Sequence, residues 1–165
     1  MENVSINKSI RLSEHITLGE VTKSSHAEIY NIPSHVAIEN LKRVCVWLEA
    51  LRYRYNQRYV SPPNSGGEED TEEPIIINSG YRSPELNKKV GGAPTSNHLT
   101  GCAVDIRVAG IEQALRYTVI LMDYADETQQ DYDELLIERN KSGRYWVHFA
   151  VRPKDNRRNT RLIQK

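Results

Sequence analysis

Apolar residues recur at helical intervals in two long segments of the chain. After Pro33, most of the positions between the apolar residues are charged or polar, and the apolar set is Val36, Leu41, Val44, Cys45, Leu48 and Leu51. This spacing places the set on one face of an amphipathic helix, which we expect to be the main packing helix. A second long helix is predicted over residues 111–124.

Two shorter helices are predicted from the residues that begin them. Thr17 is followed three residues later by Glu20, which is the spacing of a capping box, and should open a short helix that runs toward Tyr30. Ser83 is followed by Pro84, so an N-cap residue stands directly before a proline in the first turn. This pair predicts another short helix.

Short apolar runs and alternation predict the strands. Residues 75–77 are three isoleucines that lead into turn formers, and residues 102–108 alternate, with Asp105 on the face opposite the apolar positions. Residues 135–139 and 145–151 are predicted to be two strands joined by a short turn. This order of elements favours an α+β domain in which helices cover one face of a small, mainly antiparallel sheet.

The length of 165 residues suits a single domain that spans residues 1–165. Residues 60–74 combine turn formers with a run of acids, and we interpret them as a mobile acidic loop. This loop is either a solvated connection or a flap beside a cleft. Residues 153–165 form a basic tail that we expect to be solvated, with contact to an anionic polymer as the alternative.

Charge and hydropathy exclude some classes of partner. The 22 basic residues balance 22 acidic ones, so no overall field favours nucleic acid or an anionic membrane. No segment approaches the ~20 apolar residues of a membrane span, and the first residues lack the apolar core of a secretory signal. We expect a monomer made in the cytoplasm without a signal peptide. Export through a separate pore remains open.

Histidine and aspartate side chains indicate a candidate metal site. Gly101 permits a sharp turn between His98 and Asp105, so that a residue before the strand can converge with one on its face. His148 is the third candidate, because strand alternation separates it from the apolar face of residues 145–151. A hydrolytic zinc site usually has three protein ligands and one open position. Surface or core roles for the histidines remain the alternative at this point.

The remaining histidines and cysteines are weaker candidates for a metal. His15, His26 and His35 lie in polar N-terminal segments. Cys45 and Cys102 form no CxxC pair, and we predict that both are buried, reduced thiols, with metal ligation as the alternative.

A dense motif then connects two of the candidate ligands. The segment SNHLTGCAVD at residues 96–105 resembles the SxHxxGxAxD pattern of the D-alanyl-D-alanine carboxypeptidase family of zinc peptidases. Trp146-Val147-His148 is similar to the W-x-H segment that bears the second histidine ligand of that family, and SGYRS around Arg82 resembles its substrate-binding turn. The resemblance runs from about Leu12 to Val151.

The resemblance implies a fold, a cofactor and a reaction. It implies Zn2+ bound by His98, Asp105 and His148 on the scaffold shared with lysostaphin-type endopeptidases and the hedgehog signalling domain. It also implies hydrolysis of peptidoglycan stem peptides, by a D-Ala-D-Ala carboxypeptidase or an endolysin-type endopeptidase. The peptidoglycan peptide is then the partner, and a phage-derived protein would reach the cell wall through a separate pore. A non-catalytic zinc domain of the same fold is the alternative function.

The general base is less well specified. Many relatives place an acid three positions before the last histidine, but Tyr145 stands there in this chain. The small phage and bacterial members carry acids in the preceding strand, and we choose Glu138, with Glu134 and Asp133 as alternatives. Glu138 faces the same side as His148 only if it pairs with the tryptophan of the W-x-H segment.

Two further residues are expected at the substrate. Arg82 suits a substrate carboxylate or a developing oxyanion, because its guanidinium is planar and can form two parallel hydrogen bonds. Ser96 either hydrogen-bonds the substrate or orders the loop that carries His98. These two roles remain open.

Overall fold

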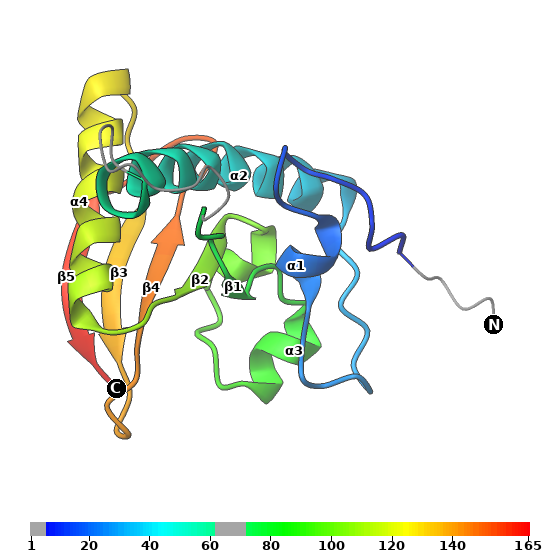
Figure 1. The fold of residues 1–165 in the computed structure, drawn as a ribbon. Coiled ribbons are helices and arrows are strands. Elements are labelled where there is room, and N and C mark those ends of the chain that lie inside the picture. Colours follow the sequence, from blue (N-terminus) through cyan, green and yellow to red (C-terminus); the bar gives the residue numbers. More distant parts are fainter. Residues whose placement is uncertain (1–5, 62–71) are drawn as a thin grey trace.

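The strands form one five-stranded sheet in the order β1-β2-β4-β3-β5 (Figure 1). The structure is a computed structural model and describes residues 6–61 and 72–165. Pairing is antiparallel except between β3 and β5, which are parallel. The predicted α+β class is therefore confirmed, with a mixed rather than a purely antiparallel sheet. The strands are β1 (Ile77–Ser79), β2 (Ala103–Arg107), β3 (Glu134–Arg139), β4 (Tyr145–Ala150) and β5 (Asn159–Gln164).

Four α-helices accompany the sheet in the described residues: α1 (Leu18–Thr22), α2 (His35–Tyr55), α3 (Pro84–Lys89) and α4 (Ile111–Thr128). A π-helical turn, Asn56–Val60, extends α2, and a 3-10 turn, Asn97–Thr100, precedes β2. The predicted long helices correspond to α2 and α4. No helix among the described residues is long and apolar enough to cross a membrane.

The two long helices pack on one face of the sheet. Trp47 of α2 contacts the rings of Tyr124 on α4 and Phe149 on β4, with ring centroids 4.9 and 5.4 Å away. Because side chains alternate along a strand, the residues between the core positions of the central strands project to the opposite face. That face carries the polar groups described below.

The caps at the helix starts follow the sequence, but one helix is shorter than expected. Thr17 and Glu20 form the predicted capping box, and Ser83 caps α3. The helix after Thr17 ends at Thr22 and does not run toward Tyr30, because Lys23 already has extended backbone angles. The residues that follow are mostly polar and offer no apolar face that would extend the helix.

The C-terminal segment is more ordered than a solvated tail. Residues 159–164 form β5, which pairs along the whole length of β3, although most of their side chains are exposed. The pairing satisfies backbone groups that β3 would otherwise present at an open edge. The acidic loop predicted over residues 60–74 lies largely outside the described residues. Cys45 and Cys102 are buried and free.

Candidate metal centre

His98 is held in place by the turn before β2. The Ser96 hydroxyl accepts a hydrogen bond from the backbone N–H of His98, and the turn ends at Gly101 with a φ of 74°. A Cβ at position 101 would lie 2.4 Å from the carbonyl oxygen of Ala37 on α2. Glycine, which has no Cβ, therefore accommodates both the positive φ and the close approach of α2 at this position. The Ser96 side chain thus caps the turn that carries His98, and it also lines the cleft described below.

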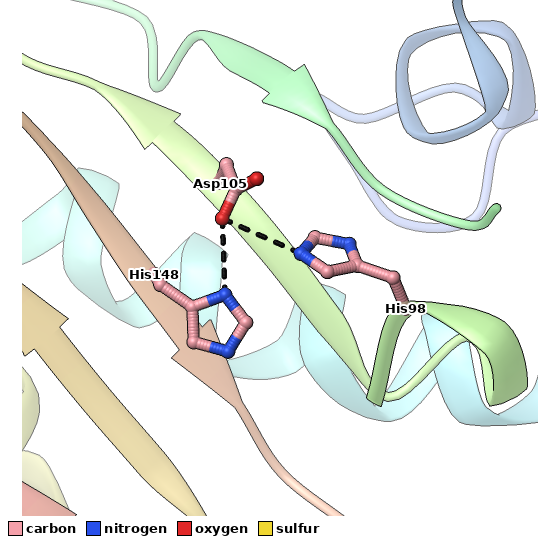
Figure 2. A group of neighbouring side chains, drawn as sticks. All are labelled: His98, Asp105 and His148. Atoms are coloured by element: carbon pink, nitrogen blue, oxygen red, sulfur yellow. Dashed lines mark hydrogen bonds and ion pairs between the residues drawn. The ribbon is translucent and has the colours of Figure 1, made fainter. Parts of the chain in front are cut away.

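Asp105 and His148 lie directly opposite each other on neighbouring strands. They form a cross-strand pair between β2 and β4, and Nδ1 of His148 is 3.0 Å from Oδ1 of Asp105. Nε2 of His98 is 3.4 Å from the same oxygen. Figure 2 shows both rings directed at this carboxylate. One ligand atom from each of the three residues lies within 4.8 Å of the others, so the group could hold a metal ion.

The outer nitrogen of each histidine ring has its own hydrogen-bond acceptor. Nδ1 of His98 lies 2.6 Å from the carbonyl oxygen of Gly80, and Nε2 of His148 lies 2.9 Å from Oε2 of Glu134. Metal-bound histidines usually donate their outer N–H in this way, which leaves the inner nitrogen free to bind the ion. Two imidazoles and one carboxylate are also a suitable ligand set for zinc.

Gly80 allows its carbonyl to reach His98. A Cβ at position 80 would lie 2.3 Å from the carbonyl oxygen of Val21, at the end of α1. The backbone N–H of Tyr81 donates to that same oxygen at 2.7 Å. The packing of α1 against residue 80 therefore fixes the acceptor for His98.

The second oxygen of Asp105 is bound by Arg82. Nη2 of Arg82 donates to Oδ2 of Asp105 at 2.9 Å, and Nε donates to the hydroxyl of Ser79 at 3.0 Å. This contact leaves Oδ1 directed at the two histidines. Arg82 also lines the cleft above the centre, so one guanidinium borders both the carboxylate and the space for a substrate.

Asp105 and His148 shift each other's pKa values, because each stabilises the charged form of the other. Burial alone would raise the pKa of Asp105, but His98 and His148 outweigh it and hold that pKa far below its ordinary value. Burial alone would lower the pKa of His148, but hydrogen bonds to Asp105 and Glu134 raise it to about 9.

The three candidate general bases have different surroundings. Asp133 is fully buried and accepts hydrogen bonds from Arg157 and from Asn97, which excludes it from the cleft. Glu134 contacts the outer nitrogen of His148. Glu138 pairs with Trp146, so it lies on the same face as His148. Its Oε2 forms a 2.8 Å ion pair with Lys165.

A cleft of about 620 Å³ lies above the three candidate ligands. Its other polar walls include Arg82, Glu138 and Asn97, and Leu136 and Trp146 supply apolar surface. Such a mixture of a few converging polar groups with apolar walls is typical of small-ligand sites. A substrate that enters the cleft would reach the metal position and Glu138 together.

The comparison with protein families agrees with this geometry. Residues 67–130 match the model of the family Peptidase M15. Over these residues the chain is similar to Peptidase M15. The predicted resemblance to the D-alanyl-D-alanine carboxypeptidase-like zinc peptidases is thereby confirmed, and the match supports a metallopeptidase of this general kind. The matched segment contains Arg82, His98 and Asp105, while His148 and Glu138 lie beyond it. No curated protein matches the chain.

The sequence alone did not identify the groups that support the ligands. The sequence indicates Glu134 only as an alternative base, and it gives no indication of the Gly80 carbonyl. Alternation along the strand could have placed Glu134 on the face of His148, since Glu134 and Glu138 lie an even number of residues apart. A backbone carbonyl leaves no such signal.

Proposed function

We propose that the protein is a zinc metallopeptidase that hydrolyses peptide bonds in the stem peptides of bacterial peptidoglycan. The observation that carries the proposal is the convergence of His98, Asp105 and His148 at the floor of a cleft, with an acceptor on the outer nitrogen of each ring. The family match supports the reaction class, and the choice of zinc rests on the ligand types.

The side chains divide the work as follows. A zinc ion at the three ligands would supply Lewis acidity for a peptide carbonyl and lower the pKa of water. Glu138 is the proposed general base, which takes a proton from the attacking water and returns one to the leaving amine. Glu134 orients His148 and is therefore a positioning residue. Arg82 holds Asp105 and, from the wall of the cleft, binds the substrate carbonyl or carboxylate.

The experiment that tests the function is hydrolysis of defined muropeptides by the zinc-loaded protein, followed by mass spectrometry of the products. Release of terminal D-alanine identifies a carboxypeptidase, and cleavage inside the stem identifies an endopeptidase. Removal of the metal with a chelator should abolish turnover, and added zinc should restore it. Full turnover without bound metal, or zinc bound away from the three ligands, contradicts the proposal.

A second candidate function is a zinc-containing binding domain without turnover. The ion pair between Glu138 and Lys165 favours it, because one carboxylate oxygen of the proposed base is already in contact with an ammonium group. The same assay discriminates the two functions, since a binding domain would retain zinc and bind the peptide without forming products.

A further inference from the structure

A second cleft opens beside the metal centre, where β2 ends and β4 begins. Its volume is about 740 Å³, and Asn78, Arg107 and Arg144 are among the residues that line it. Arg107 is the last residue of β2, and Arg144 directly precedes β4. The two arginines therefore approach the cleft from neighbouring strands.

Within the described residues, no acidic side chain balances the charge of this cleft. Both arginine side chains are exposed, and neither has a hydrogen-bond or ion-pair partner within residues 6–61 and 72–165. Among these described residues, no acidic side chain lines the cleft. Most other arginines near the sheet are paired, as Arg82 is with Asp105 and Arg157 is with Asp133. Two free guanidinium groups beside an amide favour an anionic ligand.

Strand pairing relates the second cleft to the metal centre. Asp105 pairs with His148, and two residues further along β2 Arg107 pairs with Trp146. Alternation places Arg107 on the same face as Asp105, roughly 7 Å away along the strand. Trp146 lines the metal cleft, while its partner Arg107 lines the second one. An extended peptide of about two residues covers that separation.

We propose that Arg107 and Arg144 form a subsite for a carboxylate of the bound peptide, about two residues from the cleaved bond. The inference rests on the proposed peptidase function and specifies its substrate class: peptides with a free carboxylate at this position are preferred over their amidated counterparts. The Asn78 amide, which lines the same cleft, is a further donor for the carboxylate. Arg107 and Arg144 determine specificity and take no part in the chemical step.

The test compares stem peptides in which each free carboxyl group is amidated in turn. The zinc-loaded full chain should show a kcat/KM about tenfold higher for the free acid than for the amide at one position. Arg107→Gln and Arg144→Gln should each reduce this preference roughly threefold, and the double variant should remove it. The reduced preference should arise mainly from a lower kcat/KM for the free acid, because the substitutions remove the charged contact with its carboxylate.

Lys141→Gln is the matched control. It removes one positive charge from the same hairpin turn, but Lys141 does not line the cleft, so the preference should be retained. Circular dichroism verifies that each variant is folded. Equal kcat/KM for acid and amide in the unmodified protein, or a preference that survives in the double variant, overturns the subsite.

A binding measurement separates this inference from the proposed function. Analogues of the same two peptides with a reduced, uncleavable peptide bond are titrated into the zinc-loaded protein by calorimetry. If the unmodified protein binds the acid selectively and the double variant does not, the subsite is supported. This conclusion holds even if no peptide is hydrolysed, and in that case only the peptidase proposal fails. Hydrolysis without any selectivity overturns the subsite and leaves the peptidase intact.

Discussion

Oε2 of Glu134 lies 2.9 Å from Nε2 of His148, on the side of the ring that faces away from Asp105. The ring is thereby held between two carboxylates, because its Nδ1 is 3.0 Å from Oδ1 of Asp105. Only one of these carboxylates shares the metal position. Glu134 thus contacts a candidate ligand without being one of the three residues of the candidate centre.

Replacing Glu134 tests this positioning role. Glu134→Ala should weaken zinc binding by roughly 10- to 100-fold, because His148 loses the acceptor that orients its ring. Glu134→Gln retains a carbonyl oxygen at the same place and should recover most of the affinity. Competition with a chromophoric chelator measures both values. Equal affinity in the alanine variant and the unmodified protein would refute the role.

Replacing Glu138 tests the general base. Glu138→Ala should lower kcat by about 10²- to 10⁴-fold, because no carboxylate is left to take the proton of the attacking water. Zinc should remain stoichiometric, since Glu138 is not a ligand, and metal analysis of the purified variant checks this. Glu134→Gln is a suitable comparison, as it alters a neighbouring carboxylate on the same strand. Unchanged turnover in Glu138→Ala would assign the base elsewhere.

Glycine at position 101 should be required for stability as well as for the site. Gly101→Ala is expected to lower the free energy of unfolding by about 2 kcal/mol or more, because it combines a positive φ with a clash against α2. Gly91→Ala isolates the backbone contribution, since Gly91 has a φ of 73° and a Cβ added there would meet no heavy atom within 4 Å. Gly91→Ala should lower the free energy of unfolding by only about 1 kcal/mol. Urea denaturation measures both.

Asp133 should make stability depend on acid pH. Burial alone would raise the pKa of Asp133, but hydrogen bonds from Arg157 and Asn97 lower it below its ordinary value. The folded pKa is thus below the unfolded one of about 4, so the stabilisation is complete above pH 4 and is lost as the pH falls through the folded pKa. Asp133→Asn should destabilise the protein at neutral pH by about 3 kcal/mol.

Thermal unfolding between pH 2 and pH 7 checks this dependence. Asp133→Asn should flatten the decline of Tm on the acid side. Asp131→Asn serves as the control, because it removes a carboxylate that is 56% exposed and should leave the decline almost unchanged. A steep acid decline that persists in Asp133→Asn would place the responsible carboxylate elsewhere.

The sequence predicted those parts of the fold in which local signals agree. The apolar spacing of α2 and the capping box at Thr17 produce the expected helices, since packing and local propensity point the same way. The predicted length of α1 was wrong, because a capping box specifies where a helix begins and not where it ends. The strand β5 was missed because its side chains are mostly exposed and its order comes from backbone pairing with β3.

The candidate site was predictable where it depends on side-chain types at fixed spacing. His98 and Asp105 follow from one dense motif, and the face of His148 follows from strand alternation. The hairpin allowed Glu138 to pair with Tyr145 or with Trp146, and the structure adopts the second pairing. The carbonyl of Gly80 and the contact of Arg82 with Asp105 depend on tertiary packing, which no local pattern in the sequence encodes.

The candidate metal centre forms only when β2 and β4 pair in the observed register, because Asp105 and His148 lie opposite each other on these strands. Sliding β2 past β4 by one residue would turn Asp105 into the hydrophobic core and bring Val104 or Ile106 to the open face. The shifted sheet would then lose apolar side chains from its core and would also lose the convergence of the three candidate metal ligands. Misassembled molecules should therefore be recognisable by an inability to retain zinc.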